Sequence, residues 1–190
     1  LLFLFPMYWL AISAFRPQDE IFTSPPQLVP YSLYFGNFTD LFDATNFVRA
    51  FVNSVIIAIG HCTLALFLCS LAGYAFAVYP EAPGRNALFA FVLATMMVPG
   101  VVTLIPVFVI LCKLHLVNTY WAMIVPGAAN AFGIFWMRQA TLQSVHRDLV
   151  HAARIDGCTE FGIYWRVALP MLRPALAALL DSLTADAFAR

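Results

Sequence analysis

The sequence has little charge. Asp, Glu, Lys and Arg together make up 11% of its 190 residues, and ten basic side chains balance ten acidic ones. Soluble domains carry about a quarter charged residues, so this composition is poor for a soluble protein. A net charge of zero gives no indication of the basic surface that binds nucleic acid. Apolar residues take the place of the missing charge, at 62% of the chain, which favours a membrane protein.

Sequence patterns for metal and nucleotide sites are also missing. The four cysteines, Cys62, Cys69, Cys112 and Cys158, form no CxxC pair and no Cys/His spacing typical of a metal site. We therefore interpret them as small packing residues. The chain contains no GxxxxGK[ST] phosphate-binding loop. We predict no catalytic residue, no metal site and no cofactor bound by this chain.

Long apolar runs are what the sequence does have. Residues 51–78 contain one side chain of the Asp, Glu, Lys, Arg and His group, His61, and residues 87–112 and 120–137 contain none. A helix needs about 20 apolar residues to cross a bilayer. We assign membrane helices to 51–78, 87–112 and 119–137. The predicted fold class is all-α, a polytopic transmembrane helical protein.

Both ends of the sequence are apolar but short. We interpret residues 1–15 as a partial first membrane helix, since the basic region and cleavage site of a signal peptide are not visible. Residues 171–180 are predicted to start a further helix. Residues 181–190 are a divergent tail, because Asp181 and Asp186 would be costly inside a bilayer. We expect a fragment with about five visible spans.

Basic residues predict the orientation. The loops on one side of the predicted spans carry Arg85, Arg138, Arg147, Arg154, Arg166 and Arg173, whereas the other side carries Arg16, Arg49 and Lys113. Basic residues concentrate on the cytoplasmic side. Residues 138–170 are therefore predicted to be cytoplasmic. Residues 16–50 are predicted to be external, with a short helix near 37–42.

Proline and polar residues interrupt the predicted spans. Pro99, Pro106 and the pair Pro126-Gly127 each break the hydrogen-bonding pattern of a helix. Such breaks either line a transport pathway or are packing kinks. His61 is either functional or held by one neighbouring helix, and we favour the second. Asn130 either meets a substrate or packs between helices, and again we favour packing.

The most informative segment is polar and runs from His151 to Pro170. Residues 147–156 can form a helix with Leu149, Ala152, Ala153 and Asp156 on one side. Gly157 is suited to stop this helix, and Thr159 can cap a second one that ends at Leu169-Pro170. The pair of helices either docks onto a soluble partner or lies on the membrane surface.

The spacing within this segment resembles the EAA motif of the permease subunits of ABC importers. That motif has Glu-Ala-Ala, three residues, Gly, nine residues, Ile, one residue and Leu-Pro. Ala152, Ala153, Gly157, Leu169 and Pro170 stand at the matching positions. Other stretches resemble the carbohydrate-uptake branch, on the side of the maltose-type second permease subunit: AFRPQDEIFTSPP, NSVIIA, LAGYAFA, ATMMVPGVVTLIP and NTYWAMIVPG. The resemblance runs from residue 1 to about residue 179.

The resemblance implies a function and partners. The chain would be a non-catalytic permease subunit of an ATP-driven sugar importer in the bacterial inner membrane. Its partners would be a second permease subunit, a cytoplasmic dimer of ATP-binding subunits, an extracytoplasmic solute-binding protein and the lipid bilayer. The residues assigned to ATPase coupling are His151, Ala152, Ala153, Asp156, Gly157, Glu160, Leu169 and Pro170. The candidates for the pathway are Pro99, Pro106 and Asn130.

Two departures from the family pattern keep alternatives open. His151 stands where the family has Glu, so we transfer no salt bridge to it, and coupling would then rest on Asp156 and Glu160. The sequence also diverges after Leu179, where the family continues through a fifth and a sixth span. A non-functional truncated permease is therefore one alternative. A secondary carrier or membrane-embedded enzyme is another, although the three complete spans lack the acidic residues these would need.

Overall fold

The computed structural model describes residues 4–21, 28–29, 33–44 and 46–189. All regular elements in these ranges are helices, which confirms the all-α prediction. The chain divides into two compact units, Leu1–Asn53 and Ser54–Arg190.

The first unit contains three short helices. They are α1 (Phe5–Ser13), α2 (Gln18–Ile21) and α3 (Gly36–Ala44). The side-chain amide of Asn37 in α3 donates to the backbone oxygens of Arg16, at 2.6 Å, and Ala14, at 3.1 Å. These bonds hold α3 against the end of α1. The short helix predicted near residues 37–42 is confirmed by α3, whereas the role of residues 1–15 as a membrane helix stays a prediction.

Helix α4 (Phe47–Val78) is long and apolar enough to cross a membrane, with 32 residues. It contains the predicted span 51–78. Among the described residues it is the one helix that meets these criteria by itself. The number of candidate membrane spans in these residues rises to three if each of two bent helix pairs forms one span. The predicted number of about five spans stays a prediction.

The interval 87–112 is not one straight helix. It contains α5 (Arg85–Thr95) and α6 (Gly100–Lys113), which are bent by 104° relative to each other. Pro99 lies at the break with an extended ψ of 131°. Proline cannot donate a backbone hydrogen bond, and it also disfavours helical geometry in the residue before it. Pro106, by contrast, lies inside α6 without ending it.

The interval 119–137 is also divided. Helix α7 (Trp121–Ile124) is followed by a turn through Pro126 and Gly127, whose φ is 80°. Helix α8 (Ala131–Ser144) then begins, and it continues beyond residue 137 into the segment predicted as a loop. No Gly or Pro between residues 138 and 146 stops it.

The last part of the chain is helical through most of its length. It contains α9 (Arg147–Ile155), α10 (Glu160–Ile163), the π-helical turn η2 (Tyr164–Ala168), α11 (Leu169–Met171) and α12 (Arg173–Ala189). The helical pattern passes through Leu169-Pro170 and bends by 79° at Leu172, so the predicted end at Pro170 is slightly early. The wider turn of a π-helix ends at Ala168, two residues before Pro170, and the missing N–H of Pro170 would interrupt regular α-helical bonding here. Helix α12 also continues through the predicted tail.

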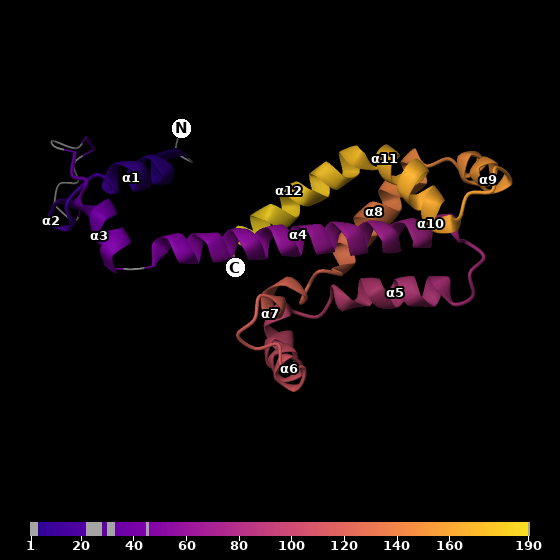
Figure 1. Ribbon diagram of the computed structural model, residues 1–190, viewed down its shortest axis with the longest axis horizontal. Coiled ribbons are helices and arrows are strands. Elements are labelled where there is room, and N and C mark those ends of the chain that lie inside the picture. The colour runs from indigo at the N-terminus through magenta and orange to yellow at the C-terminus, as the bar shows by residue number, and fades with distance from the viewer. Residues whose placement is uncertain (1–3, 22–27, 30–32, 45, 190) are drawn as a thin grey trace. The chain divides into compact units, whose positions relative to one another are not determined.

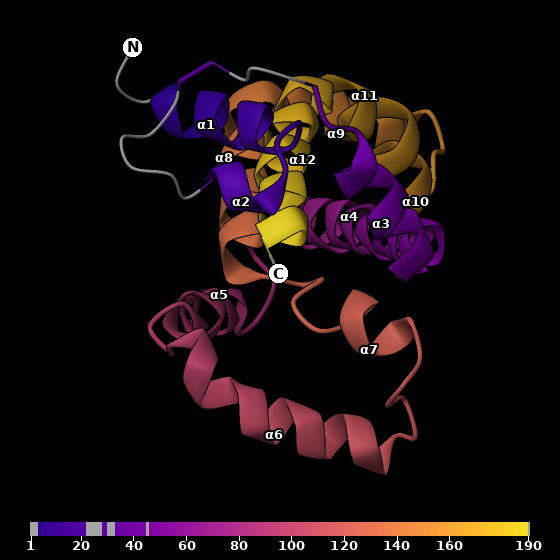
Figure 2. The same cartoon turned by 90° about the vertical axis from the view of Figure 1, so that its left-hand side faces the viewer.

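Small residues allow close packing in the second unit. A Cβ on Gly73 of α4 would lie 2.6 Å from the Cβ of Met137, and one on Gly133 of α8 would lie 2.7 Å from the sulfur of Cys69. Small residues at such contacts are typical of helix packing in membranes. Figures 1 and 2 show α8 and α12 close to α4, while α9 and α10 lie at the end of α4 that contains Val78. The buried core lies among these elements and includes Tyr164, Leu172 and Leu179.

Candidate functional site

Helix α9 has one buried and one exposed side. Val150 and Ala153 are 2% and 9% exposed and belong to the same core cluster as Ile163. Leu149 and Ile155 are 42% and 87% exposed. The surface available to a partner therefore includes Leu149, Ala152 and Ile155, but Ala153 is not part of it. Ala153 packs inward together with Val150, away from the exposed Ala152, and its role in ATPase coupling stays a prediction.

The turn after α9 has the geometry predicted from Gly157. Its φ is 81°, in the left-handed region. The N–H of Gly157 donates to the oxygen of Arg154, and the N–H of Cys158 donates to the oxygen of Ala153, both at 3.0 Å. This pair of bonds is the Schellman motif that ends many helices. The side-chain oxygen of Thr159 then accepts from the N–H of Gly162 at 3.2 Å, which confirms the predicted cap of the second helix.

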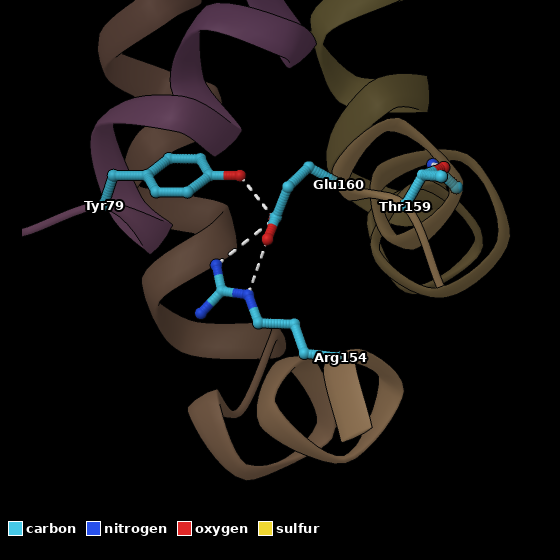
Figure 3. A network of polar contacts seen from close by, with 5 residues as sticks. Tyr79, Arg154, Thr159 and Glu160 are labelled. Atoms are coloured by element: carbon cyan, nitrogen blue, oxygen red, sulfur yellow. Dashed lines mark hydrogen bonds and ion pairs between the residues drawn. The ribbon is translucent and has the colours of Figure 1, made fainter. Parts of the chain in front are cut away.

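Three side chains connect this turn to the end of α4 (Figure 3). We call Tyr79, Arg154 and Glu160 the Tyr79 clamp. Arg154 donates from Nε to Oε1 of Glu160 at 2.7 Å and from Nη2 to Oε2 at 3.2 Å. The hydroxyl of Tyr79 donates to the same Oε2 at 2.5 Å. The guanidinium of Arg154 also lies 5.6 Å from the centre of the Tyr79 ring. One carboxylate thus joins α9 and α10 to the residue that directly follows α4.

The clamp changes the acidity of its members. Hydrogen bonds from Arg154 and then from Tyr79 hold the pKa of the Glu160 carboxyl below its usual range. Partial burial and then the hydrogen bond to Glu160 raise the pKa of the Tyr79 hydroxyl. The hydrogen bond to Glu160 also raises the pKa of Arg154. Glu160 is therefore ionised at neutral pH, and Tyr79 is protonated and able to donate.

A second polar contact lies deeper along α4. The hydroxyls of Ser70 and Tyr164 are 2.8 Å apart in a buried position. The rings of Tyr74 and Tyr164 also pack with their centres 5.4 Å apart. Tyr164 is the first residue of the π-helical turn. Helix α10 and the turn that follows it are therefore attached to the end of α4 at two levels, by Glu160 of the clamp and by Tyr164.

A cavity of about 660 Å³ lies beside α9. Its wall is formed by the end of α4 with the loop that follows, the end of α8, and α9 itself. Tyr79, Arg154 and His151 are among the lining residues, together with apolar side chains such as Val145 and Val150. On this side, open space separates parts of α9 from α4 and α8.

The other predicted coupling residues lie around the clamp with differing exposure. His151 and Ala152 are exposed on α9, and Asp156 is its exposed C-cap residue. Leu169 is partly buried and packs against the core, whereas Pro170 is exposed in the first turn of α11. Glu160 is the predicted coupling residue that takes part in the clamp, where its carboxylate binds within the chain.

The predicted pathway residues have local structural roles. Pro99 precedes α6 and, like Pro106, is exposed. Asn130 caps α8, since its Oδ1 accepts from the N–H of Gly133 at 2.6 Å. The buried His61 places Nδ1 3.0 Å from the backbone oxygen of Ile124, in agreement with the structural role favoured for it. A role of Pro99, Pro106 and Asn130 in a pathway stays a prediction.

Sequence reasoning did not identify Tyr79, Tyr164 or the pairing of Arg154 with Glu160. Arg154 and Glu160 are six residues apart across a turn, and Tyr79 is 81 residues away from Glu160. No local sequence pattern predicts a contact between residues so far apart in the chain. The nearest signal is the position of Tyr79, directly after the long apolar helix and before Pro80.

Comparison with known proteins places this arrangement in a family. Residues 69–183, which include the clamp, match the family model described as "Binding-protein-dependent transport system inner membrane component". The chain is 37% identical over 183 residues to the arabinooligosaccharides transport system permease protein AraQ of Bacillus subtilis (strain 168), covering 95% of this chain and 64% of the relative. It is 32% identical over 175 residues to the lactose transport system permease protein LacG of Rhizobium radiobacter, with coverage of 92% and 63%.

A solved structure shows the same fold. It is a chain in the crystal structure of a bacterial ABC transporter involved in the import of the acidic polysaccharide alginate. The TM-score is 0.83 at 23% identity, and the match covers 97% of this chain and 64% of that chain. The predicted fold of an ABC importer permease is thereby confirmed. The chain spans just under two thirds of the length of these relatives. It belongs to the family of binding-protein-dependent transport system inner membrane components.

Proposed function

We propose that the chain is a permease subunit of an ATP-driven importer of sugars or sugar-like solutes. The relatives support this substrate class, because the names of AraQ, LacG and the diacetylchitobiose uptake system permease protein NgcG of Streptomyces coelicolor all refer to carbohydrates. The chain contributes helices to the translocation path together with a second permease subunit. It does not hydrolyse ATP itself.

The observation that carries the proposal is the exposed side of α9. Leu149, Ala152 and Ile155 form an apolar surface on a helix whose other side is fixed in the core. Large apolar side chains exposed on a polar loop mark a site for a protein partner. We assign this surface to a cytoplasmic ATP-binding subunit. The excess of basic residues around it supports a cytoplasmic position.

The side chain at position 151 changes the charge of this surface. His151 is exposed beside the apolar residues, in the position of the family's Glu. Because Glu160 is already paired with Arg154, docking relies on apolar contact more than on an ion pair to the partner. We expect His151→Glu to leave transport equal or better. A clear loss of transport would show that His151 has a role of its own.

Reconstitution tests the proposed function. The full-length permease that contains this sequence is purified with its second permease and ATP-binding subunits and placed in proteoliposomes with the solute-binding protein. Uptake of labelled oligosaccharides should require both internal ATP and the binding protein. Uptake driven by an ion gradient without ATP would instead support a secondary carrier. Absence of uptake in the assembled complex would contradict the proposal.

A further inference from the structure

We propose that Tyr79, Arg154 and Glu160 are positioning residues that join α9 to the end of α4, so that a displacement of α9 by the ATP-binding subunit moves α4 as well. The inference rests on the proposed function, since it requires that α9 is the docking helix. It adds the route by which movement of the docking helix reaches a membrane helix that is distant from it in sequence.

The geometry of the clamp gives a direct polar connection between side chains that are partly exposed, 33% for Arg154 and 50% for Glu160. Both oxygens of the Glu160 carboxylate are used, Oε1 by Arg154 and Oε2 by Arg154 and Tyr79. Bonds between ionised partners are stronger and more directional than neutral ones, particularly when a guanidinium holds a carboxylate through two bonds. Separating α9 from α4 would require breaking at least one of them.

Further contacts hold α4 to the same segment. Tyr164 follows Glu160 by one helical turn, and its hydroxyl lies 2.8 Å from that of Ser70 in α4. Its ring packs against Tyr74, one turn farther along α4. Gly73 brings the same part of α4 within backbone contact of α8. The last turns of α4 are therefore packed against α8 and Tyr164, so a displacement applied through the clamp would move them together.

The cavity beside α9 indicates why a polar connection is needed. It lies between α9, the end of α8 and the end of α4, with Thr141, Val145 and Val150 among its lining residues. Where side chains do not fill the space, packing cannot transmit a displacement directly. Tyr79 and Arg154 line the same cavity, and Glu160 binds both of them. The clamp therefore adds a polar connection between α9 and the end of α4 on the side where the cavity leaves their packing incomplete.

The test uses the full-length permease in its complete complex. Tyr79→Phe removes the hydroxyl while keeping the ring near Arg154. The matched control is Tyr8→Phe, which removes a hydroxyl that also donates over 2.5 Å, to the backbone oxygen of Leu28 outside the clamp. Three quantities are measured in proteoliposomes: basal ATP hydrolysis, its stimulation by the substrate-loaded binding protein, and sugar uptake.

We expect Tyr79→Phe to leave basal hydrolysis unchanged and to lower both stimulation and uptake by about fivefold, a typical lower value for coupling between distant sites. Tyr8→Phe should change neither. Glu160→Gln should lower the ratio of stimulated to basal hydrolysis further. Adding Tyr79→Phe to Glu160→Gln should then have little extra effect, because both changes interrupt one connection.

Three results would overturn the clamp. Normal stimulation and uptake in both Tyr79→Phe and Glu160→Gln would show that α4 receives movement by another route, while the proposed function would stand. A parallel loss of basal and stimulated hydrolysis in Tyr79→Phe would show a role in assembly alone. If the parent complex itself shows no ATP-dependent uptake, the proposed function fails and the clamp fails with it.

Discussion

Gly157 lies in residues 138–170, the predicted cytoplasmic EAA coupling loop. It offers a direct way to separate the shape of this coupling loop from the stability of the protein. Its φ of 81° favours glycine, and a Cβ at this position would meet no atom of the described residues within 4 Å. The cost of Gly157→Ala is therefore conformational rather than steric. Holding alanine in the left-handed region costs about 1–2 kcal/mol. Leaving that region instead loses the two backbone bonds of the turn, at about 0.5–1.5 kcal/mol each.

Both outcomes change the turn between α9 and α10. A cost of about 1–2 kcal/mol corresponds to a factor of about 5 to 30 in the population of the native turn. Gly84 provides a matched control, because its φ is 75° and a Cβ there would likewise have open space around it in the described part of the chain. It lies in the loop before α5 and not in the coupling loop.

The assay combines thermal unfolding of the purified complex with the initial rate of ATP-dependent uptake. We expect Gly157→Ala and Gly84→Ala to lower the melting temperature by similar amounts, and only Gly157→Ala to lower uptake per complex. Gly157→Asn should recover part of the loss, since Asn tolerates the left-handed region. Equal uptake in Gly157→Ala and the parent, or an equal loss in Gly84→Ala, would show that the conformation of this turn does not control coupling.

Three further predictions concern packing and charge. Gly73→Ala places a Cβ 2.7 Å from a backbone nitrogen of α8. We expect thermal unfolding to show a net loss of about 1–2 kcal/mol in the free energy of unfolding, after the gain in helix propensity. Gly100→Ala, with open space around it among the described residues, should be neutral or stabilising. Tyr74→Phe removes a buried hydroxyl that has no hydrogen-bond partner among the described residues, so the melting temperature should stay equal or rise, and a large drop would contradict this. The pKa of Glu160 is lowered from 4.5. The contribution of its carboxylate to stability is therefore complete above pH 4.5 and is lost as the pH falls through the lowered pKa. The difference in melting temperature between the parent and Glu160→Gln should shrink in that acidic range and stay constant around neutral pH.

Local features of the coupling loop could be predicted from the sequence. The end of α9 at Gly157 and the cap at Thr159 depend on residues within one turn, and the structure has both. Breaks at Pro99 and at Pro126-Gly127 were also expected, because proline acts on its immediate neighbours. The size of the bend at Pro99, 104°, could not be predicted. It depends on how α5 and α6 pack, which the sequence of one span does not determine.

Contacts over long distances along the chain could not be predicted. Ala153 faces the core because Val150 and Ile163 meet there, and helical periodicity alone does not choose which side of α9 is buried. The clamp depends on Tyr79 reaching Glu160 across 81 residues. Glu160 was predicted as a coupling residue from its place in the motif, but its binding to Tyr79 and Arg154 becomes visible only in three dimensions.

Photo-crosslinking from α9 examines whether this helix is the surface that meets the ATP-binding subunit. A photoreactive amino acid replaces Ile155, which is 87% exposed on α9, or Val101, which is 85% exposed on α6. The complete transporter is irradiated and the crosslinked subunits are identified by mass. We expect a crosslink from position 155 to the ATP-binding subunit and none from position 101. Absence of the crosslink at position 155, or an equal yield at position 101, would contradict the assignment of α9 as the docking helix.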